Sequence, residues 1–385
     1  MKIIIYLTLI FFIKINSYAQ KSPKFINSVI NNGKIILTNV SINESQERFN
    51  FIFDTGSSNS AISKRAFDKL GLNINDSLNS YDGLKTETTY QTIINLSINQ
   101  EKNERLKIDV IDFSSINEMQ CEKIDGIIGG DIIKQYVWSI EKDSIFIAHK
   151  IKAFNTNSYQ KFKMSSILYD TPIIIAGFLN DFSATMLFDT GDNTLIAIAE
   201  EQIKDIDIKN KTRGIGKVYS TVLGNECIDT TYYLKPQNPF MLYYSDLFIN
   251  DVYVDMNHDG DLLSSIGSKI FDYFDILLDY KKKQIYFKQT NNNYIKEKEF
   301  GFKWKVNENK NVFITFLWDN SPAYYAGLKL GMQIINVNNI DLNSNKYSKC
   351  DIYQLIRREL NKKQEITIKL KESSKEYLLK KTNRN

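Results

Sequence analysis

Two copies of a short Asp-Thr-Gly motif constrain this chain more than any other feature. Residues 50–59 read Asn-Phe-Ile-Phe-Asp-Thr-Gly-Ser-Ser-Asn, so an apolar run ends in a carboxylate and a glycine. This pattern predicts a buried strand that delivers Asp54 into a tight turn. Residues 185–193 repeat the pattern and place Asp189 at the same point. The fold must therefore accommodate two strand-turn units, each with one carboxylate.

The surroundings of the two motifs repeat as well. A short apolar-Gly element follows each motif, and two predicted strands follow each element. The two motif aspartates are 135 residues apart (189 minus 54), which is about the length of one small domain. An internal duplication is the simplest explanation. The two elements are Ile127-Ile128-Gly129 and Ser265-Ile266-Gly267.

A pair of carboxylates at such turns suits acid–base chemistry on a water molecule. Like charges about 3 Å apart cannot both ionise, so a close pair keeps one proton. The ionised carboxylate can take a proton from water, while the protonated one polarises a peptide carbonyl. Because the two titrate as a pair, the sequence assigns no fixed role to Asp54 or Asp189 separately.

The neighbouring residues have chemistry that supports such a pair. Threonine hydroxyls can tie the two turns through hydrogen bonds to the backbone, and glycines allow a sharp turn and a close approach. Ser57 is placed to hydrogen-bond the adjacent carboxylate. The expected supporting residues are Thr55, Gly56, Ser57, Thr190 and Gly191.

The doubled pattern resembles the aspartic proteases, and most closely their retropepsin-type and pepsin-type lobes. Residues 53–59 are similar to the first active-site turn of that family, and residues 188–191 to the second. The two apolar-Gly elements resemble the segment that passes behind each catalytic turn. The resemblance covers about residues 25–290 and implies an aspartic-type endopeptidase that uses Asp54 and Asp189, without a cofactor or metal.

The second turn departs from the family at Asp192-Asn193, where Ser, Thr or Ala is more usual. The additional carboxylate either raises the pKa of the pair or forms a salt bridge. The resemblance also implies a hairpin over the substrate between the first turn and the first apolar-Gly element. We expect its tip at Tyr81-Asp82-Gly83. We interpret Gly214-Ile215-Gly216 as a loop in the equivalent place of the second half.

The last part of the chain, about residues 296–380, resembles a bacterial PDZ domain. Residues 321–334 are similar to the helix-then-strand signature of that family, and residues 351–360 have helical spacing. In this resemblance the loop Phe300-Gly301-Phe302 binds the carboxylate of a peptide C-terminus. The peptide adds as a strand between residues 302–304 and the helix. The alternative is a packing module with a closed groove.

The predicted fold is mainly β. It consists of two tandem acid-protease-like β-barrel lobes, at residues 25–150 and 160–290, followed by a PDZ-like α+β domain at residues 296–380. Residues 1–19 resemble a secretory signal, with a charged start, an apolar run and a small-residue exit at Ala19. We therefore expect an exported protein, periplasmic or secreted from a bacterium, without a stable membrane span after cleavage.

Composition excludes several other classes. The net charge of +4 comes from scattered lysines, which predicts no nucleic-acid partner. The three cysteines, in three different regions, match neither a disulfide framework nor a zinc site, so we interpret them as free thiols. The stretch from Asp255 begins like a calcium loop, but its twelfth position is Ile266 where a glutamate is required, so we expect a polar loop. The cysteines are Cys121, Cys227 and Cys350.

Two further functional hypotheses stay open. The expected partners of an endopeptidase are polypeptide substrates, with a C-terminal peptide as a ligand of the PDZ-like domain. The first alternative is a catalytically inactive protease-like scaffold that binds peptides through that domain. The second is an exported scaffold without enzymatic ancestry, which the duplicated motif disfavours. The pair forms either within one chain or across a dimer axis.

Overall fold

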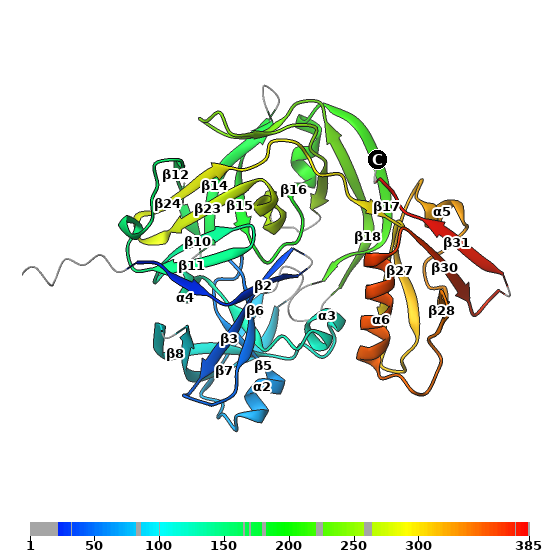
Figure 1. Cartoon of the computed structure of the whole chain (residues 1–385), viewed down its shortest axis with the longest axis horizontal. Coiled ribbons are helices and arrows are strands. Elements are labelled where there is room, and N and C mark those ends of the chain that lie inside the picture. The colour runs from blue at the N-terminus through cyan, green and yellow to red at the C-terminus, as the bar shows by residue number, and fades with distance from the viewer. Residues whose placement is uncertain are drawn as a thin grey trace, which may run out of the picture.

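Figure 1 shows the computed structural model of the chain. It describes residues 22–31, 33–81, 86–99, 101–164, 166–168, 171–178, 182–220, 226–257, 264–373 and 375–383. The predicted signal segment, the expected hairpin tip at Asp82 and Gly83, and residues 258–260 of the calcium-like stretch lie outside the described residues. Within the described ranges, no helix is long and apolar enough to cross a membrane.

The first half of the chain, residues 24–148, is a β-structure with three short helices. Its main sheet has the strand order β2-β3-β4-β9-β5-β8-β7-β6. Its core is formed by the apolar side chains that alternate along the strands, such as Phe51 and Phe53. The elements are β1 (Lys24–Ile26), β2 (Ser28–Asn31), β3 (Lys34–Ile42), β4 (Phe49–Phe53), β5 (Ala61–Ser63), α2 (Lys64–Lys69), β6 (Asp76–Tyr81), β7 (Thr86–Ile98), β8 (Glu101–Ile111), α3 (Asn117–Cys121), β9 (Gly126–Ile128), α4 (Gly130–Ile133), β10 (Val137–Glu141) and β11 (Ser144–Ala148).

The second half, residues 160–289, repeats this arrangement. Strand β15 pairs in parallel with β22, and β16 pairs antiparallel with β22, as β4 and β5 do with β9. The hairpin β17–β18 therefore occupies the same topological place as the hairpin β6–β7. The elements are β12 (Gln160–Lys163), β13 (Ser166–Leu168), β14 (Thr171–Phe178), β15 (Phe182–Asp189), β16 (Ile196–Ala199), the 3-10 helix η2 (Glu200–Asp205), β17 (Ile208–Ser220), β18 (Glu226–Pro236), β19 (Phe240–Leu242), β20 (Phe248–Ile249), β21 (Val254–Asn257), β22 (Ser264–Gly267), η3 (Ser268–Asp272), β23 (Phe274–Asp279), η4 (Tyr280–Lys282) and β24 (Gln284–Gln289).

One sheet joins the two halves. Its strand order is β1-β11-β10-β23-β24-β12, so three strands come from each half and meet at the β10–β23 pair. In that pair Val137 lies opposite Asp279 and Ile140 opposite Ile276. The fold is mainly β, as the sequence predicts. The predicted strand pair after each apolar-Gly element is also confirmed, since these pairs are β10–β11 and β23–β24.

The C-terminal module, residues 298–383, is a small sheet with two helices. Strand β27 lies between β26 and β28, and β30 and β31 continue the sheet. The predicted helix at residues 351–360 is confirmed as part of α6, which starts with a capping box at Ser348 and Asp351. The elements are β25 (Lys298–Glu299), β26 (Phe302–Val306), β27 (Val312–Trp318), α5 (Pro322–Tyr325), β28 (Gln333–Val337), β29 (Ile340–Asp341), α6 (Lys349–Lys362), β30 (Glu365–Leu370), β31 (Glu376–Lys380) and β32 (Thr382–Asn383).

The prediction of a loop at Gly214-Ile215-Gly216 is wrong. These residues lie within β17, which pairs with β18 on one side and with β27 of the C-terminal module on the other. A Cβ on Gly214 would lie 2.3 Å from the Phe316 ring, and one on Gly216 would lie 2.3 Å from the Thr315 carbonyl oxygen. The glycines are there because another strand approaches closely, which sequence alone does not distinguish from a loop signal.

The interpretation of the cysteines as free thiols is wrong for two of them. Cys121 at the end of α3 and Cys350 at the start of α6 form a disulfide that links residues 229 positions apart. In Figure 1, α3 and α6 lie side by side, and they are in contact. The first half and the C-terminal module are thus covalently joined. Cys227 lies half-buried on β18.

The close approach of β27 to β17 gives a test of this junction. We expect Gly214→Val to lower the free energy of unfolding by about 1–3 kcal/mol, because the new side chain overlaps the Phe316 and Trp318 rings. The matched control is Ile215→Ala on the same strand, where the side chain is 38% exposed and the expected loss is smaller. Urea denaturation measures both. Equal losses in the two variants would contradict the proposed packing.

Candidate active site

The first motif aspartate sits where the sequence predicts it, just past the end of β4. The pairing of β4 with β9 holds this strand in the core, and the Asp54 amide donates to the Ile128 carbonyl at 3.0 Å. One oxygen of the Asp54 carboxylate, Oδ1, accepts from the backbone amides of Gly56 at 2.9 Å and Ser57 at 3.1 Å. The turn therefore fixes the orientation of the carboxylate.

The second motif repeats this geometry at the end of β15. Asp189 is paired in parallel register with Gly267 of the second apolar-Gly element. Its Oδ1 accepts from the amides of Gly191 at 2.8 Å and Asp192 at 3.3 Å. The two turns thus orient their carboxylates in the same way.

The two threonines tie the turns together as the sequence predicts. The Thr55 hydroxyl donates to the Phe188 carbonyl at 2.6 Å, and the Thr190 hydroxyl donates to the Phe53 carbonyl at 2.7 Å. Each hydroxyl also accepts from the amide of the other threonine, both at 3.0 Å. Because both threonines are fully buried, these four hydrogen bonds are made without competition from water.

The glycines bring the two carboxylates together. A Cβ on Gly56 would lie 2.3 Å from the Asp189 Cγ, and one on Gly191 would lie 2.5 Å from the Asp54 Cγ. Each carboxyl group is therefore pressed against the backbone of the opposite turn, in space that only glycine leaves open. Asp54 and Asp189 form one pair across the junction of the two halves, within one chain.

The environment of the pair disfavours negative charge. Burial raises the pKa of Asp54 above its ordinary value, although the hydrogen bond from Asp189 opposes the shift. Burial, and then the charge of Asp54, raise the pKa of Asp189 to about 8. The two carboxyls therefore titrate as a pair that holds one proton up to neutral pH and beyond.

Asp192 is accommodated by hydroxyl and amide donors. Its carboxylate accepts from the Thr194 amide at 2.9 Å, the Thr194 hydroxyl at 2.7 Å and the Ser265 hydroxyl at 3.0 Å. Burial, and then the charge of Asp189, raise the pKa of Asp192 to about 6. Asp192 thus joins the second turn to its apolar-Gly element and places a third titratable carboxyl next to the pair.

The first half contains a counterpart of Asp192 that sequence reasoning missed. Asp131 follows the first apolar-Gly element, and its Oδ1 accepts from the Ser60 amide at 3.0 Å and the Ser60 hydroxyl at 2.6 Å. Burial raises its pKa as well. Both halves therefore join turn and element through one carboxylate, which comes from the element in the first half and from the turn in the second. An aspartate two residues after the first apolar-Gly element is the sequence signal that would have found Asp131.

Ser57 contributes through its backbone. Its amide donates to Asp54, while its hydroxyl donates to the Asn59 carbonyl at 2.8 Å. The expected hydrogen bond to the carboxylate is thus made by the main chain.

The residues predicted to bind a peptide C-terminus lie far along the chain, where β26 begins. Phe300 is buried in the core of the C-terminal module, and Gly301 has a positive φ of 84°. The Gly301 carbonyl accepts from the Trp318 amide at 2.9 Å, and Phe302 pairs with Leu317 of β27. The structure does not bring this segment into contact with the aspartate pair through any interaction among the described residues. Its peptide-binding role stays a prediction.

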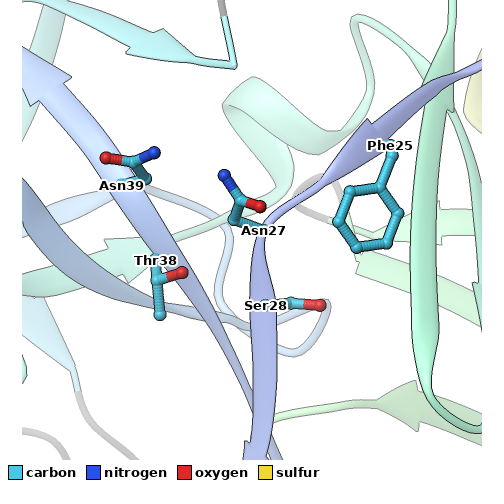
Figure 2. A pocket seen from close by; sticks show the side chains of 5 residues that line it. All are labelled: Phe25, Asn27, Ser28, Thr38 and Asn39. Carbon is cyan, nitrogen blue, oxygen red and sulfur yellow. The ribbon is translucent and has the colours of Figure 1, made fainter.

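A separate pocket lies where β1 and β2 meet β3. Figure 2 shows Phe25, Asn27 and Ser28 on one segment and Thr38 and Asn39 on the neighbouring strand. The pocket has a volume of about 340 Å³, and neither motif aspartate lines it. Amide and hydroxyl groups supply its polar surface, so it offers hydrogen bonding without a titratable group.

The threonine hydrogen bonds predict a matched pair of variants. We expect Thr190→Val to lower the free energy of unfolding by about 2–4 kcal/mol, because it leaves the buried Phe53 carbonyl and Thr55 amide without partners. Thr190→Ser keeps the hydroxyl and loses only a methyl group, at a cost of about 1 kcal/mol. Chemical denaturation of both variants measures the difference. Equal costs would show that the hydroxyl contributes nothing.

Comparison with known proteins agrees with this geometry. A search of curated proteins gives no match. Residues 38–132 of the chain match a protein family, and this range contains the first turn and the first apolar-Gly element. The family is described as aspartyl protease, and the match supports an aspartic protease as the general class of this chain.

Proposed function

We propose that the chain is an exported aspartic endopeptidase that hydrolyses peptide bonds with water activated by Asp54 and Asp189. The observation that carries the proposal is the contact of two carboxyl groups, each held by two turn amides, in two turns that are joined by reciprocal threonine hydrogen bonds. A pair in which one carboxyl is ionised and the other protonated supplies a base and an acid at one point.

The reaction follows from this proton arrangement. The ionised carboxylate takes a proton from a bound water, and the water oxygen adds to the carbonyl carbon of the substrate. The protonated carboxyl gives its proton to the carbonyl oxygen, which forms a neutral tetrahedral intermediate. The carboxyl that took the proton from water then gives it to the amide nitrogen, and the carbon–nitrogen bond breaks. The other carboxylate takes a proton from a hydroxyl of the intermediate, which becomes the product carboxyl group, so the pair returns to its initial state. The turn amides of Gly56 and Gly191 keep the two carboxyls oriented throughout.

Two observations favour this proposal over an inactive peptide-binding scaffold. Both carboxyl groups are retained with their full set of backbone donors, which a protein that only binds peptides does not require. The pKa of about 8 for Asp189 keeps the pair singly protonated in the pH range where export compartments operate.

The Cys121–Cys350 disulfide supports export, because disulfides persist in oxidising compartments.

The dyad assignment is tested by substitution. We expect Asp54→Asn and Asp189→Asn each to lower kcat/KM by about 10²–10⁴-fold, because each removes an acid–base group. Cleavage of a fluorogenic peptide library by the purified chain from pH 3 to 8 measures this loss. The control is Asp131→Asn, which lies behind the first turn and is expected to retain much more activity. Absence of cleavage by the unsubstituted chain over that whole pH range would contradict the proposed function.

The raised pKa of Asp189 predicts the pH profile. Activity requires one proton on the pair, so kcat/KM should fall as the pH rises through about 8, where the pair loses this shared proton. At acidic pH, kcat/KM should fall where the ionised carboxylate of the pair also becomes protonated. A kcat/KM profile between pH 3 and 9 locates both limbs. An alkaline limb near pH 4 to 5 would show that the pair does not share a proton as described.

Asp192 predicts a pH dependence of stability. Its pKa of about 6 in the folded chain exceeds the value of about 4 in an unfolded chain. The stability it contributes is therefore full below pH 4 and is lost as the pH rises through 6. We expect the loss of unfolding free energy between pH 4 and 7 to be smaller in Asp192→Asn than in the unsubstituted chain, by on the order of 2 kcal/mol. Urea denaturation at the two pH values measures the difference, and equal losses would contradict the assigned environment.

A further inference from the structure

The C-terminal module is attached to the second half through a shared sheet. Strand β27 pairs with β17, with Gly214 opposite Trp318 and Gly216 opposite Phe316. The Arg213 guanidinium lies 2.8 Å from the Asp319 carboxylate beside this pairing. The module thereby extends the hairpin β17–β18, which is the second-half counterpart of the hairpin β6–β7.

Charge and aromatic packing reinforce this attachment. Glu226 at the start of β18 forms ion pairs with Lys305 of β26 at 2.6 Å and Lys217 of β17 at 2.9 Å. A buried cluster beside the paired strands contains aromatic residues of both parts. In this cluster the ring centroids of Tyr233 and Trp318 are 6.0 Å apart. The contact is therefore a continuous sheet with its own small core.

The module is attached to the first half through β26 and α6, which are in contact with each other. Strand β26 pairs with β27. Helix α3 of the first half contacts both β26 and α6. The Asn117 side-chain amide donates to the Val306 carbonyl of β26 at 2.9 Å, and the Gln354 amide of α6 donates to the Cys121 carbonyl at 3.3 Å. Arg357 of α6 forms an ion pair with Glu122 just beyond α3.

We propose that the C-terminal module is an intramolecular strap that holds the two halves together, with α3 docked on β26 and α6 and the Cys121–Cys350 disulfide as its redox-sensitive anchor. A peptide strand added along β26 would have to replace the Asn117 hydrogen bond to the Val306 carbonyl. The surface near Val306 and the first turns of α6 is thus occupied by the chain itself.

The disulfide is suited to be the anchor because it is a covalent link between α3 and the module. The noncovalent polar contacts beside it include the Asn117, Gln354 and Arg357 interactions already described, and a hydrogen bond between Tyr353 and Glu122. Cys121 is buried within the core cluster of the module, whereas Cys350 is only partly buried. An exogenous dithiol can reduce the bond. It gives two electrons and two protons to form the two thiols and becomes a cyclic disulfide.

The strap acts on the site through position. The aspartate pair forms between the halves, so it depends on their relative placement as well as on the threonine hydrogen bonds. This part of the inference rests on the proposed function. Reduction should loosen the hold of the module on α3 of the first half while the buried turns stay assembled. The loss should therefore appear in kcat/KM without a shift of the pH profile.

The experiment compares the folded full chain with its disulfide intact and after treatment with dithiothreitol, which avoids the need to fold a variant without the bond. We expect hydrogen–deuterium exchange in residues 117–121 and 350–357 to become about tenfold faster on reduction, and kcat/KM to fall at least threefold and to recover on reoxidation. The double variant Cys121→Ser/Cys350→Ser should have the exchange rates and kcat/KM of the reduced chain, and dithiothreitol should change neither. Cys227→Ser is the matched control and should respond like the unsubstituted chain.

Unchanged exchange in these two helices after complete reduction would overturn the proposal, whatever the activity. Faster exchange with unchanged kcat/KM would overturn the positional role of the strap. The exchange measurement does not depend on peptide cleavage, so an inactive chain would reject the proposed function while the strap is still tested. Mass-spectrometric mapping that finds Cys121 and Cys350 as thiols in the untreated, exported chain would also overturn the proposal.

Discussion

The contact of two buried carboxyl groups is the constraint on which the rest of this structure depends. Two ionised carboxylates in contact repel each other, and burial makes their negative charge still less favourable. Four turn amides offset part of this cost at Asp54 and Asp189, and a shared proton offsets more. The remaining cost must be met by the structure around the turns. The buried threonine hydrogen bonds do this locally, and the sheet that joins the two halves does it over a longer range.

The two halves meet this demand with nearly the same construction but not with the same residues. Each turn is backed by an apolar-Gly element and held to it by a carboxylate. In the first half Asp131 reaches from the element to Ser60, and in the second half Asp192 reaches from the turn to Ser265. The departure of Asp192 from the usual pattern is therefore a change in which side supplies the carboxylate. Asp192 also gives the second turn an additional negative charge beside Asp189 above pH 6, so the two turns differ in their charge.

The site was largely predictable from sequence because its determinants are local. An apolar strand, an aspartate and a glycine within a few residues specify each turn, and the threonine ties follow from hydroxyls at equivalent positions. The features that were missed depend on contacts between distant segments. Cys121 and Cys350 are single cysteines in different regions, and only the docking of α3 on α6 brings them together. Glycine is a loop signal, so the sequence predicts a loop at residues 214–216, whereas in the structure these glycines make room for β27.

Carboxyl carbon NMR of aspartate-labelled protein can show whether Asp54 and Asp189 share one proton within a single chain. We expect one carboxyl of the pair to keep its proton to about pH 8. In Asp54→Asn, the pKa of Asp189 should fall, because the charge of its neighbour is removed, yet stay above its ordinary value, because the site remains buried. Independent titration of both carboxyls near pH 4, with no change at Asp189 in Asp54→Asn, would rule out the shared proton.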